Sequence, residues 1–209
     1  MAAIVTTFFT AFLISFLGQL PLGNTSLTAT QIRVQEGLKS AILYMWGVAI
    51  VEMIYLRIAL TGMDWIFQHP IIFKSIGWVT VVFFCVLGIV SIKSAYQQHT
   101  EKKGILINNQ LNRFVLGLWL CAMNPAQIPF WFLWTSYALE WKILHSNTVA
   151  YNVFTVGAGL GTIGGLLVYI YGGNYLITKK NVSNRKLNLI MGIIFLIAGI
   201  AQLWRMIDK

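Results

Sequence analysis

Residues 17–28 read Leu17-Gly-Gln-Leu-Pro21-Leu-Gly-Asn24-Thr-Ser-Leu-Thr28, a polar and helix-breaking stretch inside the first long apolar segment of the chain. Hydrocarbon contains no water that could satisfy free backbone groups. An interruption at membrane depth therefore survives only where protein or an aqueous cavity surrounds it. The stretch predicts a broken helix beside a buried or wet site.

A second interruption of the same kind lies in the other half of the chain. Residues 122–129 read Ala122-Met-Asn124-Pro125-Ala-Gln127-Ile-Pro129, inside the first apolar segment after a long polar stretch. Paired Pro/Gly breaks at corresponding positions of two halves point to the substrate site of a transporter. We expect the two breaks to meet near the middle of the bilayer.

The composition indicates an integral membrane protein. Of 209 residues, 57% are hydrophobic and 10% are charged, against about 25% charged in soluble domains, and the mean hydropathy is +0.72. The net charge of +9 does not indicate nucleic-acid binding, because the basic residues cluster between apolar segments rather than on a soluble face. The two cysteines, Cys85 and Cys121, stand apart in apolar segments, so we expect neither a metal site nor a cofactor.

Six segments approach or exceed the roughly 20 apolar residues that a spanning helix needs. They run over about residues 3–32, 38–63, 71–92, 114–139, 148–171 and 187–206. The predicted fold class is therefore an all-α integral membrane protein with six transmembrane helices, of which the first and fourth are broken. Residues 1–98 and 114–209 form two three-helix repeats around a basic loop at residues 99–113. Because three is an odd number, the two repeats enter the membrane from opposite faces and are inverted relative to each other.

The distribution of Lys and Arg predicts the orientation. Ten basic residues lie in the loops after the first, third and fifth segments: Arg33, Lys39, Lys93, Lys102, Lys103, Arg113, Lys179, Lys180, Arg185 and Lys186. The other side holds four: Lys74, Lys142, Arg205 and Lys209. The positive-inside rule places the first set in the cytoplasm and both termini outside.

Glu52 is the most informative single residue. It lies about ten residues, and hence roughly 15 Å, from the outer end of its segment. A charged side chain near the midplane costs about 2.5–3.5 kcal/mol on insertion scales. One interpretation is a protonated carboxyl that bonds a neighbouring helix. The other, which we favour, is a proton relay or a counter-ion for a substrate ammonium group.

A second ionisable side chain, Arg57, lies five residues further along the same segment. The two are poor partners within one helix, because neighbours are spaced three or four residues apart. Arg57 is close enough to the outer end to extend its guanidinium to the interface. A gate, or a contact to a substrate carboxylate, is the alternative.

The two breaks supply the remaining candidate binding residues. Small polar residues after Pro21 and Gly23 are typical of the N-terminus of a half-helix, with Asn24 or Thr25 as its cap. The free N–H groups and positive dipole end of such a helix favour a carboxylate. The second break offers the amides of Asn124 and Gln127 and the unpaired carbonyls near Pro125 and Pro129, because each proline removes one helical hydrogen bond. A plain kink is the alternative for either break.

The fifth segment carries three glycines at spacings of four: Gly157, Gly161 and Gly165. Such consecutive GxxxG steps allow two helix backbones to approach closely. Packing inside the monomer is one interpretation, and a homodimer interface is the other.

These motifs resemble the LysE/RhtB superfamily of small bacterial amino-acid exporters over nearly the whole chain. The family pattern is Pro-Gly-Pro-Asn in the first helix, Gly-x-x-x-Gly-Asp in the second and Asn-Pro-Lys in the fourth. Five residues match it: Pro21, Asn24, Gly47, Asn124 and Pro125. The chain departs from the pattern elsewhere. Leu22 and Gly23 replace a Gly-Pro pair, Val51 replaces a glycine, Glu52 replaces an aspartate and Ala126 replaces a lysine. The resemblance implies a divergent member that exports an amino acid or related metabolite, driven by the proton motive force.

The expected function is thus secondary transport of a small molecule across the bacterial inner membrane, with a midplane site between the two breaks. A structural or assembly subunit, in which the breaks are only kinks, is the first alternative. A membrane-embedded enzyme is the second, although the sequence lacks a nucleophile–base pair, a metal cluster or paired thiols. Substrate, direction, coupling ion and oligomeric state do not follow from the sequence.

Overall fold

The computed structural model of the protein describes residues 2–20, 23–96, 111–178 and 182–208. Within these ranges the chain forms eight α-helices and no strand. They are α1 (Ala2–Gln19), α2 (Asn24–Glu36), α3 (Leu38–Phe67), α4 (Pro70–Tyr96), α5 (Arg113–Ala122), α6 (Gln127–Glu140), α7 (Thr148–Thr178) and α8 (Val182–Ile207). The all-helical class predicted from the sequence is confirmed.

Four of the described helices are long and apolar enough to cross a membrane: Leu38–Phe67, Pro70–Tyr96, Thr148–Gly172 and Asn188–Ile207. The pair Ala3–Gln19 and Asn24–Glu36 passes the same test together, with a bend of 75° between its two parts. α5 is a shorter apolar helix. Length and composition thus give four spans, or five with the bent pair, against the six expected. The difference arises because the expected fourth span is divided into α5 and α6.

Both expected interruptions occur where the sequence places them. α1 ends at Gln19 and α2 begins at Asn24, while α5 ends at Ala122 and α6 begins at Gln127. Pro21 lies outside the described residues. In the second break the Asn124 side chain accepts a hydrogen bond from the backbone N–H of Ala126 at 3.1 Å, which fixes the turn between the two helices.

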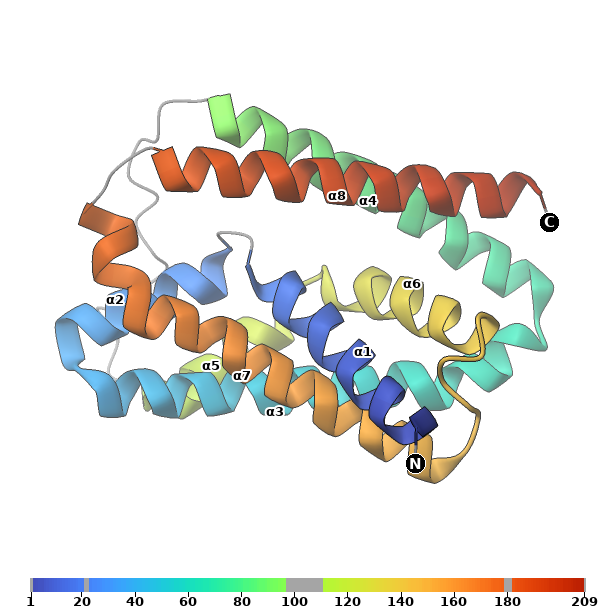
Figure 1. Cartoon of the computed structure of the whole chain (residues 1–209), viewed down its shortest axis with the longest axis horizontal. Helices are drawn as coiled ribbons and strands as arrows, with labels where there is room; N and C mark the ends of the chain where they lie inside the picture. The colour runs from blue at the N-terminus through green and yellow to red at the C-terminus, as the bar shows by residue number, and fades with distance from the viewer. Residues whose placement is uncertain (1, 21–22, 97–110, 179–181, 209) are drawn as a thin grey trace.

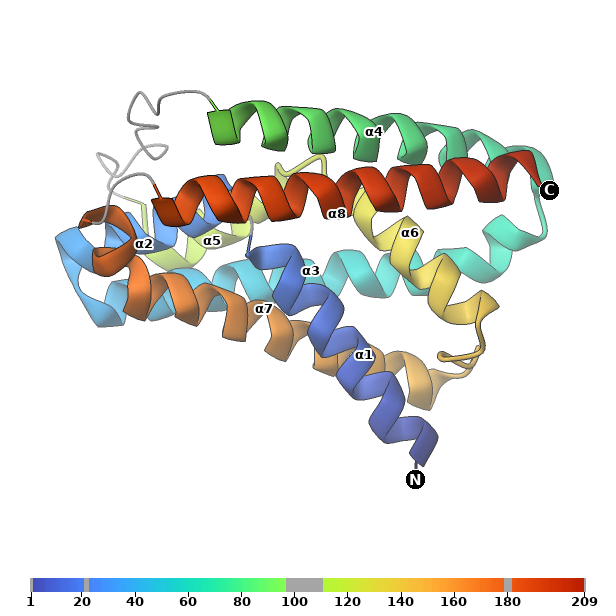
Figure 2. The ribbon, with the colours of Figure 1, turned by 45° about the horizontal axis from the view of Figure 1, so that its top comes forward.

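The helices pack in three long pairs, α1 along α7, α3 along α5 and α4 along α8. Figures 1 and 2 show α4 and α8 side by side along one side of the molecule, with α6 between them and the remaining helices. Both described ends of the chain lie at the same end of the molecule (Figure 1). Four exposed apolar side chains on α4 and α8 suit a lipid environment: Val82, Val86, Ile193 and Ile197.

Glycines allow these pairs to approach closely. A Cβ atom added at Gly157 or Gly161 would meet backbone oxygens of α1, from Phe8 and Phe12 respectively. The glycine face of α7 is therefore covered by α1 within the chain. Packing inside the monomer is the interpretation that the structure bears out, and the homodimer interface through Gly157, Gly161 and Gly165 finds no support in it.

Candidate functional site

A cavity of about 460 Å³ lies where the two breaks face the α4–α8 pair. Its volume is in the range of small-molecule sites, roughly 300–1,000 Å³. The lining divides by element. α1–α3 and the first break contribute Gly18, Gln19, Gly23, Asn24, Thr25, Ser26, Val48 and Glu52. α5, the second break and α6 contribute Leu120, Cys121, Met123, Asn124, Pro125, Ala126, Gln127 and Phe130. α4 and α8 contribute Phe83, Leu87, Val90, Ser91, Ser94, Asn188 and Phe195.

Glu52 on α3 is 2% exposed and is held by polar groups of α1. The Gln19 Nε2 atom donates to Oε2 of the carboxyl at 2.7 Å, and the Ser15 hydroxyl donates to Oε1 at 3.2 Å. Ser15 in turn shares a 2.7 Å hydrogen bond with the hydroxyl of Thr162 on α7. Among the described residues no lysine or arginine forms an ion pair with Glu52. The carboxyl is therefore solvated by neutral donors and faces the cavity without a fixed counter-ion.

The first break presents the start of α2 to the cavity. The cap position is Gly23, which offers no side-chain hydrogen bond, so the expectation that Asn24 or Thr25 caps this helix is wrong. Glycine has no side chain with which to satisfy the first N–H groups of the helix, and these groups are therefore left for another acceptor. Asn24 and Thr25 line the cavity as the first two residues of α2.

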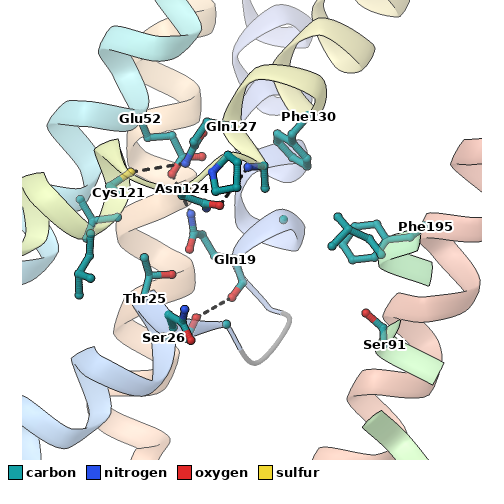
Figure 3. A pocket seen from close by; sticks show the side chains of 18 of the residues that line it. Gln19, Thr25, Ser26, Glu52, Ser91, Cys121, Asn124, Gln127, Phe130 and Phe195 are labelled. Atoms are coloured by element: carbon teal, nitrogen blue, oxygen red, sulfur yellow. Dashed lines mark hydrogen bonds between the residues drawn. The ribbon is translucent and has the colours of Figure 1, made fainter. Parts of the chain in front are cut away.

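Side chains from other segments stabilise the end of α1 at this break. The Tyr169 hydroxyl, on α7, donates to the backbone oxygen of Leu20. The Ser26 hydroxyl donates to the backbone oxygen of Gln19 at 3.2 Å (Figure 3). Because the last carbonyls of a helix have no partner within it, these bonds make the interruption tolerable in a low-dielectric surrounding.

The second break is satisfied in a similar way. The Tyr55 hydroxyl, on α3, donates to the backbone oxygen of Ala122 at 2.8 Å. Gln127 bridges the break, because its Nε2 atom lies 3.4 Å from the Cys121 sulfur and its Oε1 atom accepts from the Trp131 indole at 3.0 Å. Both ends of the Gln127 amide are thus occupied by neighbouring side chains of α5 and α6.

Most of the predicted site residues meet in this one cavity. Figure 3 shows Gln19, Glu52, Asn124 and Gln127 on the side of the two breaks, with Ser91 and Phe195 opposite. The predicted residues that line the cavity are Asn24, Thr25, Glu52, Asn124, Pro125 and Gln127. Pro21 falls outside the description. Arg57 is not among the lining residues, and its guanidinium carbon lies 5.7 Å from the ring centroid of Tyr151.

The sequence did not indicate the wall that α4 and α8 form. The stretches of these helices that line the cavity are mostly apolar, so no periodic pattern there distinguishes the side chains that face the cavity from those that face lipid. Ser91, Ser94 and Asn188 are the polar exceptions on this wall, and they were the available signal.

The described lining of the cavity contains a single acidic residue and no basic one. Glu52 is the one carboxylate of its lining, and no lysine, arginine or histidine is among the described residues around it. No group of three or more His, Cys, Asp or Glu residues in the described chain could hold a metal ion. The arrangement can bind a cation at Glu52 and can offer helix N–H groups and amides to a polar or anionic group.

An all-helical chain with several membrane-crossing helices and an internal cavity at two helix breaks is a multi-pass membrane protein of the transporter class. The model of a protein family described as LysE type translocator matches residues 5–205. The chain therefore belongs to the LysE type translocator family, a family of exporters of amino acids or similar molecules rather than of enzymes. No curated protein and no solved structure matches the chain.

Proposed function

We propose that this protein is a secondary transporter that exports an amino acid or a related small metabolite across the bacterial inner membrane, with coupling to protons. The observation that carries this proposal is the cavity that joins both helix breaks to Glu52, a buried carboxyl with no fixed cation among the described residues. A structural subunit would need neither the cavity nor an uncompensated carboxyl near its centre, because buried ionisable groups in membranes are costly unless they are used.

The proposed architecture is six spans in two inverted repeats, with α1–α2 and α5–α6 each counted as one interrupted span. Reciprocal packing supports it. The first helix of each half packs along the helix that forms the second span of the other half, α1 on α7 and α5 on α3. The third helices, α4 and α8, pack on each other at Gly88 and Gly192, where a Cβ on either glycine would lie 3.0 Å from the backbone oxygen of the other.

The tyrosine contacts at the breaks follow the same exchange. Tyr169 of α7 bonds the end of α1, and Tyr55 of α3 bonds the end of α5. In this arrangement both termini face outward, and the loops after the first, third and fifth spans face the cytoplasm. The helix breaks then lie at the midplane, where rocking of one part of the molecule against the other alternates access.

In the proposed complex the substrate carboxylate binds the start of α2 at Asn24 and Thr25, where the free N–H groups and the helix dipole favour an anion. The substrate ammonium faces Glu52 or the carbonyls near Asn124 and Pro125. In this placement each charged end of the zwitterion lies at the part of the cavity that has the opposite polarity.

Proton coupling follows from competition for one carboxyl. No described residue supplies Glu52 with a fixed partner cation, so a bare carboxylate in the cavity is destabilised and takes up either a proton or the substrate ammonium. Because the proton and the substrate exclude each other at Glu52, the carrier changes conformation with substrate bound in one direction and with a proton bound in the other. The two fluxes are thereby linked in antiport.

Reconstitution into proteoliposomes tests the proposal. Counterflow with a panel of amino acids should reveal saturable exchange of at least one of them. Glu52→Gln should abolish accumulation driven by a pH gradient, because a neutral amide cannot exchange a proton. The matched control is Glu36→Gln, since Glu36 pairs with Arg113 at 2.6 Å away from the cavity. If Glu52→Gln accumulates substrate at the wild-type rate, Glu52 has no part in coupling.

A further inference from the structure

The two sides of the cavity differ in chemistry. The helix breaks supply amides, hydroxyls and the carboxyl of Glu52, whereas the opposite wall is largely apolar. This wall is formed by Phe83, Leu87 and Phe195 of α4 and α8, and the Phe130 ring of α6 extends it on the side of the breaks (Figure 3). Figure 3 shows Phe195 across the cavity from the polar groups of the breaks, and Phe130 on the far side of Gln127 from Cys121.

The rings of the wall are held in place by their neighbours. Phe195 is 9% exposed and packs edge-on against Phe84 with a centroid distance of 5.8 Å. Phe130 packs edge-on against Trp131 at 5.0 Å. Its ring also rests on Gly18 of α1, where a Cβ atom would lie only 2.7 Å from the ring. The wall is thus a preformed apolar surface rather than a set of free side chains.

The polar groups on the α4–α8 side carry no charge. They are the hydroxyls of Ser91 and Ser94 and the amide of Asn188. Since the described lining contains no cation and its carboxyl lies among the helix breaks, a charged group placed against Phe83 or Phe195 would have no partner. Burying such a group is strongly unfavourable.

We propose that this wall is the side-chain subsite of the transporter, and that it selects amino acids with a bulky aliphatic or aromatic side chain over those with a small or charged one. The proposal rests on the proposed function, because it assumes that the amino and carboxyl groups occupy the helix breaks. The proposal goes further by naming the class of amino acid, because the amino and carboxyl groups are common to all amino acids and cannot distinguish between them.

A homologous series of competitors tests the proposal in proteoliposomes that contain the full chain. Counterflow of labelled leucine is measured against unlabelled alanine, 2-aminobutyrate, norvaline and norleucine. Each added methylene buried on the wall should lower the half-inhibitory concentration about fourfold, hence roughly sixtyfold over the three methylenes from alanine to norleucine. Lysine, which is norleucine extended by an ammonium group, should compete more than about a hundredfold more weakly than norleucine.

A variant pair connects the series to the wall. Phe195→Ala should reduce the fold-decrease in half-inhibitory concentration per added methylene, because one face of the subsite is removed. Inhibition by alanine should remain measurable. Phe9→Ala is the matched control, since Phe9 is 56% exposed on α1 and does not line the cavity. It should leave the whole series unchanged.

The outcomes separate this inference from the proposed function. A rising series with lysine excluded, flattened by Phe195→Ala and not by Phe9→Ala, supports the side-chain subsite. Exchange of amino acids with a flat series, or with lysine as the strongest competitor, overturns the subsite and leaves the transporter assignment in place. Failure of every amino acid to exchange, in liposomes where the protein is folded, overturns both the subsite and the export of amino acids.

Discussion

The close approach of α5 to α3 provides a quantitative test of how the second broken helix is held. Gly117 of α5 lies against the backbone of α3, where an added Cβ atom would overlap the carbonyl oxygen of Tyr44 and lie 3.1 Å from the N atom of Val48. Gly47 on α3 makes the reciprocal contact with the Phe114 oxygen. Backbone atoms cannot rotate away, so Gly117→Ala must push the two helices apart.

The expected magnitude follows from a matched substitution in the same bundle. Gly62 on α3 has no atom within 4 Å of an added Cβ, so Gly62→Ala should only gain helix propensity, about 0.5–1 kcal/mol. Gly117→Ala gains the same propensity and loses about 1–3 kcal/mol to overpacking. Because propensity cancels between the two variants, Gly117→Ala should be less stable than Gly62→Ala by about 1–3 kcal/mol.

Thermal unfolding of the purified variants in one detergent measures this difference. At about 2–4 °C per kcal/mol for a chain of this length, the midpoints should differ by roughly 2–12 °C, with Gly62→Ala the higher. Transport should fall in Gly117→Ala, since α5 carries Ala122 and the second break at its end. Equal midpoints for the two variants would refute the close packing of α5 on α3 and the argument that this contact positions the break.

Two further predictions concern contacts outside this pair. Tyr169→Phe removes the hydroxyl that bonds the Leu20 oxygen and should cost about 0.6–1.7 kcal/mol in thermal unfolding, whereas Tyr171→Phe, at a 66% exposed tyrosine, should cost nothing measurable. Arg205→Met removes a guanidinium that pairs with Glu140 at 2.7 Å and lies 4.7 Å from the Tyr137 ring centroid. It should destabilise by about 1.5–3 kcal/mol, because the hydrogen bonds of a charged group are lost while Glu140 keeps access to water, and Glu140→Gln in the same chain should recover part of the loss if the pair is the cause.

The breaks and Glu52 were predictable from the sequence because each is a local conflict with the bilayer. Proline and glycine inside an apolar segment interrupt a helix and leave backbone groups unpaired, and a carboxyl at that depth needs a partner. The side of the cavity made by Phe83 and Phe195 was not predictable in the same way. A phenylalanine is equally compatible with lipid and with a cavity, so only the packing of α4 on α8 decides which it faces.

The cap of α2 is a position where the sequence pattern gave a wrong prediction. Asn24 and Thr25 have the chemistry of cap residues, but the chain enters the helix one residue earlier, at Gly23, and leaves the first N–H groups without a side-chain acceptor. A sequence pattern that favours a satisfied cap therefore mispredicts the start of α2, where the proposed carboxylate site depends on N–H groups that no side chain caps. Functional sites are the places where such local rules are expected to fail.

Glu52 also links the charge of the cavity to the position of the first break. Its bond from Gln19 is made at the last residue of α1, and its bond from Ser15 continues to Thr162 on α7. A proton on the carboxyl would turn one acceptor oxygen into a donor, and one of these two bonds would then have to be exchanged. An incoming ammonium would instead draw on the same lone pairs without displacing the hydroxyl chain. Because Gln19 ends the helix at the break, the proton and the substrate of the proposed exchange would act on α1 in different ways, which is the differential interaction that any ligand-driven change of conformation requires.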